Sequence, residues 1–375
     1  MIDSKYIAGP DITDLEIGIV SHMMRTGWYN YEYVELFQNE FAKYHNRTYG
    51  IMTPSCTTAI HLLLLALNVK KRDKVIVPDF TWIGSSAGVT YVGADTILVD
   101  ISEENWCLDP ALVEEYILAS TKAIIVVDIY GNMPDMNQFE KLSKKYDIPL
   151  IEDAAEAIGS SYNSRLAGNF GLASVFSFHR TKTICTGEGG MILTNDANLY
   201  DRCMFLRDHG RKKDGKPYYN YEVTPKYMPS NLAASLGFAQ LSRIDELIDK
   251  KRTIFNLYKE NLRELEDIKL NIETPVSKNG SWLVALLIGK SYHIDKETMI
   301  TLMQSKGITV RPFFYPLSSL PAYSKSVPNR FSNPVSYDIG NRGICLPSAF
   351  IITESQIVEV CNAIKEILNG RKRSI

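Results

Sequence analysis

The sequence predicts an α/β protein whose mainly parallel sheet is covered by helices, and three observations support this prediction. Apolar strand segments alternate with helical segments between residues 49 and 152, which is the pattern of a parallel sheet with helices on both faces. Apolar residues make up 45% of the chain, which suits a buried core. The length of 375 residues exceeds what one hydrophobic core usually serves. We therefore expect a large domain over residues 1–247 and a smaller α+β domain over residues 248–375.

The first part of the chain is predicted to form two helices and then strands that alternate with helices. The helices run from Ile12 to Thr26 and from Val34 to Tyr44, and a glycine-containing aromatic turn with Trp28 and Tyr29 separates them. We expect that turn to form part of the rim of a site. The elements that follow are strands at residues 49–53, 74–77, 96–99, 123–128 and 148–152, and helices at residues 59–67, 84–92, 110–119 and 136–146.

The second part of the chain begins with two strands around a polar turn and then changes from alternating strands and helices to a smaller α+β arrangement. A Tyr-rich polar loop at residues 210–229 is long enough to be typical of a functional segment. The other elements predicted here are helices at residues 199–206 and 231–244, a long helix from about 248 to 265, strands near 282–288 and 308–312, and closing helices that end near 368.

The composition excludes several classes of protein. With 41 basic and 43 acidic residues, the chain has no long-range field that would attract nucleic acid or an anionic membrane. The six cysteines form no CxxC pair and the six histidines show no HExxH spacing, so we expect no metal site. Neither GxGxxG nor GxxxxGK[ST] is present. The longest apolar run, Leu62 to Leu67, is too short to span a bilayer. We expect a soluble, cytoplasmic protein with reduced cysteines and without targeting signals.

Lys182 is the first candidate catalytic residue. A short apolar strand that starts at Ser174 leads into a turn of small and glycine residues, and Lys182 lies in that turn. A desolvated lysine has a lowered pKa, becomes nucleophilic and can form a Schiff base with the aldehyde of pyridoxal phosphate. The alternative is a solvated surface charge, which is the commonest role of a lysine.

Further candidates lie where the strands of the predicted sheet end. Asp153 ends an apolar strand and could hold a pyridine nitrogen protonated, or it could cap a helix from Ala154 onward. Trp82 could stack on a flat ring or belong to the core. Free backbone N–H groups of Cys56 and Thr57 at a strand-to-helix junction could bind an anion. The alternative is that Ser55 or Thr57 only caps that helix.

Five segments of the chain together resemble one family. They are Pro54-Ser-Cys-Thr-Thr-Ala, Asp79-Phe-Thr-Trp, Ile151-Glu-Asp-Ala-Ala-Glu-Ala, Ser177-Phe-His-Arg-Thr-Lys and Thr186-Gly-Glu-Gly-Gly. In this order and spacing they resemble the DegT-type nucleotide-sugar aminotransferases, a branch of the fold type I pyridoxal-phosphate enzymes. Three later segments look most like the branch that makes GDP-perosamine: Arg311-Pro-Phe-Phe-Tyr-Pro, Pro321-Ala-Tyr and Asn341-Arg-Gly-Ile-Cys-Leu-Pro.

The resemblance implies a role for each matching residue. Lys182 would form the Schiff base and then carry the proton between the substrate carbon and the cofactor, while Asp153 would pair with the pyridinium nitrogen. The other residues implied to bind the cofactor are Trp82 on the ring, Glu156 near its phenolic oxygen, Ser177 with the Cys56 and Thr57 backbone at the phosphate, and Asn231 at the phosphate in the neighbouring subunit. The residues implied on the substrate side are Trp28, Tyr29, His179, Arg311, Tyr315 and Tyr323. Most members of the family have Gly where this chain has Cys56.

The resemblance also implies a reaction. Glutamate would give its amine to pyridoxal phosphate, and the pyridoxamine phosphate form would aminate C4 of a nucleotide-linked 4-keto-6-deoxyhexose, with GDP-4-keto-6-deoxymannose giving GDP-perosamine for a surface glycan. The enzyme would be a homodimer with shared active sites and ping-pong kinetics. The motifs around Lys182 are typical of the enzymes that act at C4. There are four alternatives. The substrate could be a dTDP- or UDP-linked 4-keto sugar, or the enzyme could aminate C3 instead. The protein could also be a sugar dehydratase, in which histidine replaces the lysine, or a non-catalytic binding protein.

Overall fold

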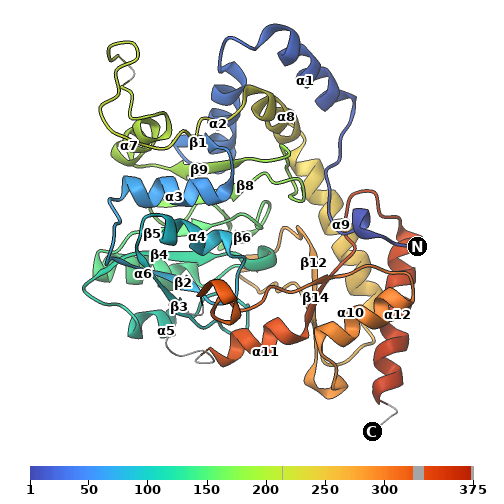
Figure 1. Cartoon of the computed structure of the whole chain (residues 1–375). Helices are drawn as coiled ribbons and strands as arrows, with labels where there is room; N and C mark the ends of the chain where they lie inside the picture. Colours follow the sequence, from blue (N-terminus) through green and yellow to red (C-terminus); the bar gives the residue numbers. More distant parts are fainter. Residues whose placement is uncertain (213, 324–332, 373–375) are drawn as a thin grey trace.

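The α/β fold class is confirmed, and its centre is a seven-stranded mixed sheet. Figure 1 shows the computed structural model, which describes residues 1–212, 214–323 and 333–372. The strand order is β1-β9-β8-β5-β4-β2-β3, and the five strands from β8 to β3 are parallel while β9 is antiparallel to both of its neighbours. The strands are β1 (Tyr49–Thr53), β2 (Lys74–Pro78), β3 (Asp95–Val99), β4 (Thr121–Val127), β5 (Leu150–Asp153), β8 (Ala173–Ser177) and β9 (Gly190–Thr194).

The helices of this part confirm the predicted alternation, with differences at several of their ends. They are α1 (Asp14–Thr26), α2 (Glu32–Tyr44), α3 (Cys56–Ala66), α4 (Gly84–Tyr91), α5 (Pro110–Glu115), α6 (Met136–Tyr146), α7 (Ala197–Arg207) and α8 (Asn231–Leu241). Helix α3 begins three residues before the predicted start because Ser55 and Thr58 form a capping box. Helix α5 ends early because the Leu118 N–H donates to the Thr121 hydroxyl, which turns the chain into β4. Ser242 and Arg243 separate α8 from the next helix, so the predicted helix at 231–244 is divided.

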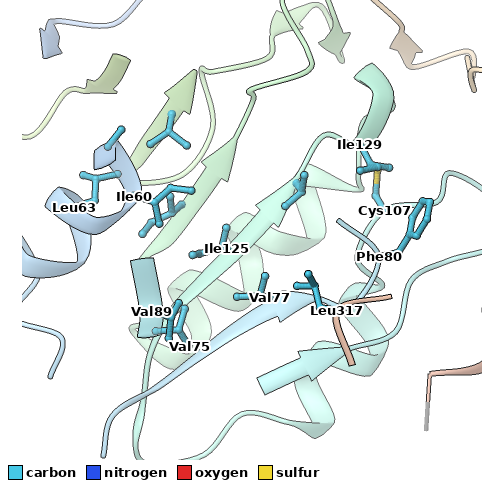
Figure 2. Close-up of a cluster of buried hydrophobic side chains, with 14 of the residues drawn as sticks. Ile60, Leu63, Val75, Val77, Phe80, Val89, Cys107, Ile125, Ile129 and Leu317 are labelled. Atoms are coloured by element: carbon cyan, nitrogen blue, oxygen red, sulfur yellow. The ribbon is translucent and has the colours of Figure 1, made fainter. Parts of the chain in front are cut away.

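Both faces of the sheet are covered because side chains in a strand alternate in direction. In β2, Val75 and Val77 face one side, where Val89 of α4 lies beside Val75 and Leu317 beside Val77 (Figure 2), and they share a core cluster with Ile60 and Leu63 of α3. Ile76, between them, belongs to the core cluster on the opposite face, with aromatic side chains of α2 and α6. This two-sided burial leaves the carboxyl ends of the parallel strands as the place for a ligand.

The last third of the chain forms a second, four-stranded antiparallel sheet with the order β10-β12-β14-β13. Its strands and helices are α9 (Ile244–Leu262), β10 (Ile268–Leu270), β12 (Val284–Ile288), α10 (Lys296–Ser305), β13 (Arg311–Pro312), α11 (Pro334–Arg342), β14 (Gly343–Leu346) and α12 (Glu354–Lys372). A small third sheet contains β6 (Ser161–Tyr162), β7 (Arg165–Leu166) and β11 (Ser277–Lys278). Short 3-10 helices lie at Ser4–Tyr6, Ile129–Gly131, Lys290–Tyr292, Leu317–Ser319 and Pro321–Tyr323. The predicted boundary at residue 248 stays a prediction.

The first residues of the chain pack on this C-terminal part. Ile2 is buried in its core cluster and exchanges backbone hydrogen bonds with the segment at Gly307 and Thr309. The N–H groups of Ser348 and Ala349 donate to the carbonyls of Ile7 and Tyr6. Residues 2–7 therefore pack on the C-terminal part of the chain, where Figure 1 shows the N-terminus beside α12, although they were predicted to belong with residues 1–247. Within the described segments, no helix is both long enough and apolar enough to cross a membrane.

Candidate active site

A cavity of about 230 Å³ lies at the carboxyl ends of the parallel strands and brings together nine of the predicted site residues. They are Cys56, Thr57, Trp82, Asp153, Glu156, Ser177, His179, Lys182 and Arg311. Their positions in sequence span 255 residues, from Cys56 to Arg311, so the fold rather than local sequence assembles the group. This is the expected place for a ligand in an open α/β sheet.

Lys182 is buried in this cavity, so the solvated-surface alternative is wrong. The residue is only 9% exposed, and its backbone N–H donates to the His179 carbonyl at 2.8 Å, which closes the turn after β8. Its Nζ lies 3.3 Å from Oε1 of Glu156. Burial lowers the pKa of Lys182, and the Glu156 carboxylate opposes that shift. The amine is therefore closer to neutral near physiological pH than an exposed lysine, as a nucleophile requires.

Asp153 is the last residue of β5, and three donors orient its carboxylate, among them the Cys56 thiol at 3.8 Å from Oδ1. The Ser85 hydroxyl donates to Oδ2 at 2.7 Å, and the backbone N–H of Ala155 donates to Oδ1 at 3.1 Å. Residues 154–160 form turns, so the helix-capping alternative is wrong. Burial raises the pKa of Asp153. A cation beside this carboxylate would offset that cost and keep it ionised.

The N-terminus of α3 forms the other end of the cavity. Ser55 caps the helix through a capping box with Thr58, as the structural alternative predicted. The backbone N–H groups of Cys56 and Thr57 are the first two of the helix and have no acceptor within it, so the cap and an anion site are compatible. Ser177, paired with Gly190 on β9, lines the cavity close to these groups.

The remaining cavity residues complete its walls. Trp82 is 58% exposed and its ring lies 5.8 Å from that of Phe314 with a tilt of 40°, so the core alternative is wrong for this tryptophan. Nδ1 of His179 lies 2.9 Å from the Thr181 hydroxyl, and burial lowers the pKa of its imidazole. Oε2 of Glu156 accepts the backbone N–H of Tyr130 at 2.9 Å.

Five predicted site residues lie outside this cavity. The Asn231 side chain links Gly27 to the start of α2. Its Nδ2 donates to the Gly27 carbonyl, and its Oδ1 accepts from the backbone N–H groups of Tyr33 and Val34. Trp28 donates to the Met24 carbonyl, and Tyr29 is fully exposed. The hydroxyls of Tyr315 and Tyr323 bind Glu297 and Ser86, respectively. Their roles toward a substrate or a neighbouring subunit stay predictions.

Sequence reasoning missed four residues of the site. Ser85 orients Asp153, Thr181 and Phe314 line the cavity, and Trp282 covers Lys182. Thr181 lies next to Lys182 in sequence, so the motif itself could have indicated it. Ser85 follows Trp82 by three residues, and Phe314 follows Arg311 by three, so both lie next to predicted residues. Trp282 has no such signal because it reaches the site from a distant segment.

A second, larger cavity of about 690 Å³ adjoins the first and shares Thr181 and Arg311 with it. Its walls come from the segment between Ser4 and Pro10, residues 309–312 with β13, and the loop before α12, and Arg180 also lines it. Among the described residues, the guanidinium groups of Arg180 and Arg311 make no side-chain hydrogen bond or ion pair. Within the part of the chain that the structure describes, the larger cavity therefore offers two arginines without a side-chain partner, next to the cavity that contains Lys182.

The residues present fit pyridoxal phosphate group by group. The α3 N-terminus suits the phosphate, the buried Asp153 carboxylate suits a protonated ring nitrogen, and the Lys182 amine suits the aldehyde. The sequence model of the DegT/DnrJ/EryC1/StrS aminotransferase family matches residues 10–365 of this chain. The chain belongs to this family. It is a pyridoxal-phosphate-dependent aminotransferase that acts on sugars, and pyridoxal phosphate is its cofactor.

Individual relatives are similar over almost their whole length. The GDP-perosamine synthase of Escherichia coli O157:H7 is 35% identical over 371 residues, which cover 98% of this chain and 100% of the relative. The GDP-perosamine synthase of Vibrio cholerae is 33% identical, with 96% and 98% covered. Among solved structures, the sugar aminotransferase Spr1654 of Streptococcus pneumoniae in its PMP form has a TM-score of 0.90 and 25% identity, with 97% of this chain and 99% of that chain covered.

Proposed function

We propose that this enzyme transfers the amino group of glutamate to C4 of a nucleotide-linked 4-keto-6-deoxyhexose. GDP-4-keto-6-deoxymannose is the first candidate, and the product would be GDP-perosamine for a surface glycan such as the O-antigen of lipopolysaccharide. The full-length similarity to relatives named GDP-perosamine synthase supports the sugar. The observation in this chain that carries the proposal is the larger cavity with its two unpaired arginines beside Lys182.

The charge of that cavity suits both proposed substrates. A nucleotide sugar carries a diphosphate, and glutamate carries a second carboxylate beyond the reacting amine. Arg311 lines both cavities, whereas Arg180 lines only the larger one. Guanidinium groups bind phosphate and carboxylate oxygens in bidentate fashion. We infer that the two substrates use this positive wall in turn, which fits a ping-pong order.

The residues of the chain have separate tasks in this mechanism. The bound cofactor supplies an electron sink that carries the amino group. Asp153 holds a proton at the ring nitrogen, and Ser85 and Ala155 keep its carboxylate in place. With substrate bound, the Lys182 amine would move a proton to or from the substrate carbon. Glu156, 3.3 Å from Nζ, favours the protonated form of that amine.

We also propose a homodimer whose active sites contain residues of both subunits. Several apolar side chains are exposed on α1 and the turn after it, including Ile17 at 56%, Met24 at 50% and Trp28 at 62%. Helices α1, α2 and α8 lie together at one end of the large sheet (Figure 1), and Asn231 begins α8 there. Several exposed apolar side chains on one helix and the turn after it are typical of a protein interface. We infer that this end of the molecule contacts the neighbouring subunit and that Asn231 approaches its cofactor phosphate.

The test is a panel of nucleotide keto-sugars with glutamate as the donor. The purified enzyme is given GDP-, dTDP- and UDP-linked 4-keto-6-deoxy sugars and a matched 3-keto compound, and products are identified by mass and NMR. We expect the GDP-linked 4-keto sugar to be aminated fastest. Faster conversion of the 3-keto compound would contradict amination at C4, and a deoxygenated product without nitrogen would show a dehydratase.

A further inference from the structure

Trp282 contacts the catalytic lysine from the C-terminal part of the chain. The indole lies just before β12 and is only 2% exposed. Nζ of Lys182 lies 3.5 Å from the centroid of its ring, within the range of a cation–π interaction. The indole Nε1–H donates to the Thr181 carbonyl at 2.6 Å. The same side chain therefore fixes the peptide before Lys182 and covers the end of the lysine side chain.

A buried asparagine holds the turn that presents Trp282. Ser281 has a φ of 60°, in the left-handed region that serine rarely adopts. Its backbone N–H donates to Oδ1 of Asn279 at 2.7 Å, which stabilises that conformation. Nδ2 of Asn279 donates to the Tyr130 carbonyl at 3.2 Å and to Oδ1 of Asn132 at 2.8 Å. Asn279 is fully buried and does not line the cofactor cavity.

Tyr130 connects the Trp282 turn back to Lys182, so that the contacts form a closed ring, here called the circuit. It too has a positive φ, 52°, which is strained for a bulky aromatic residue. Its N–H donates to Oε2 of Glu156, whose Oε1 lies 3.3 Å from the Lys182 amine. The chain of contacts thus runs from Lys182 through Glu156, Tyr130 and Asn279 to the Trp282 turn and back to Lys182.

We propose that Trp282 is a positioning residue for Lys182, held in place by Asn279. The lysine amine lies between a carboxylate on one side and an aromatic face on the other, and both partners favour its protonated form. Two strained backbone positions persist only where the surroundings over-determine them, which is typical of a functional site. The indole keeps the free amine aimed into the cavity while it carries the proton, and it excludes water from that amine.

The test compares Trp282→Leu, which removes the aromatic face, with Trp282→Phe, which keeps the face and removes the N–H donor. The first readout is the pH midpoint of the absorbance of the bound cofactor, which reports protonation of the nitrogen that joins it to Lys182. We expect the midpoint to fall by about one pKa unit in Trp282→Leu and by less in Trp282→Phe. This titration needs no substrate, so a wrong proposed donor or sugar leaves it unaffected.

The second readout is the deuterium isotope effect with α-deuterated glutamate. A misplaced lysine amine slows proton transfer, so kcat should fall by about tenfold or more in Trp282→Leu, with little change in KM, and the isotope effect should rise. Asn279→Ala should shift the midpoint in the same direction without touching the cofactor. Because both variants break one circuit, their effects should not add in the double variant.

The matched control is Trp106→Leu, since Trp106 is an equally buried tryptophan that packs on Phe313 and does not line the cofactor cavity. It should lower stability but leave the midpoint and the isotope effect unchanged. A midpoint that stays constant or rises in Trp282→Leu would overturn the proposal. Equal effects of Trp106→Leu and Trp282→Leu, or additive effects of Asn279→Ala and Trp282→Leu, would also overturn it.

Discussion

Replacement of Asp153 by asparagine tests the assignment of the cofactor ring most directly. The carboxylate is 3% exposed, and its two oxygens accept from Ser85 and Ala155. Asparagine has nearly the same shape and keeps an oxygen for one of these donors, so the fold should persist. It removes the negative charge that would hold a proton at the ring nitrogen, and without that proton the ring withdraws electrons poorly.

The expected magnitude follows from the burial of the site. An opposite charge within hydrogen-bonding distance shifts a pKa by about one to three units, and the larger shifts belong to desolvated pairs. Because Asp153 is almost fully buried, we expect the pKa of the ring nitrogen to fall by about two to three units in Asp153→Asn. Each unit corresponds to about 1.4 kcal/mol, so the transamination rate should fall by about 100- to 1,000-fold.

The assay is a single turnover of each half-reaction, followed through the absorbance of the bound cofactor. Asp79→Asn is a matched control because Asp79 is also a buried carboxylate after a strand of the same sheet, but it binds Ser318 and Asn333 instead of lining the cavity. It should lower stability and leave the cofactor absorbance unchanged. Wild-type rates in folded, cofactor-loaded Asp153→Asn would show that the ring nitrogen lies elsewhere.

Three further predictions concern the lysine, the dimer and acid stability. Lys182→Ala should abolish turnover while the protein still binds pyridoxal phosphate, as equilibrium dialysis would show; retained turnover would exclude Lys182 as the catalytic amine. Hybrid dimers of Lys182→Ala and Asn231→Ala subunits should regain about a quarter of wild-type activity, since half of the random dimers have one intact site, and no recovery would contradict shared sites. Burial lowers the pKa of His45 from 6.5 to about 4, so only the unfolded state gains this proton as pH falls below 6.5. The free energy of unfolding should fall by about 2 kcal/mol more in wild type than in His45→Gln between about pH 7.5 and about pH 5, measured with urea.

Part of the site could be predicted because topology alone determines it. Asp153 ends a central parallel strand, and Lys182 follows the next strand of the sheet, β8. Carboxyl ends of parallel neighbours meet at one edge, so their positions follow from the strand pattern. Cys56 and Thr57 were recognisable for a similar reason, since a strand that leads directly into a helix presents free N–H groups there.

Other parts could not be predicted because they depend on contacts between distant segments. Trp282 lies 100 residues from Lys182 in sequence and reaches it from the segment just before β12. In the sequence it is one more apolar residue before a strand. The packing of Ile2 beside Gly307 had no signal either, because a short terminal segment has no periodicity that names its partner. Sequence patterns report local backbone preference, whereas these contacts arise from the docking of complete elements.

The cysteine at position 56 shows how structure resolves a departure from the family pattern. The resemblance to the family implied a glycine there, which suggested that the backbone must be free of a side chain at this point. In this chain the close approach falls on Gly190 instead: a Cβ at Gly190 would lie 2.4 Å from the Ser55 carbonyl carbon and 2.6 Å from the Cys56 nitrogen. The Cys56 side chain points the other way, with Sγ 3.8 Å from Oδ1 of Asp153. The helix N–H groups would bind a phosphate through the backbone, so a side chain at position 56 would leave them open. A side chain at position 190 would displace the start of α3.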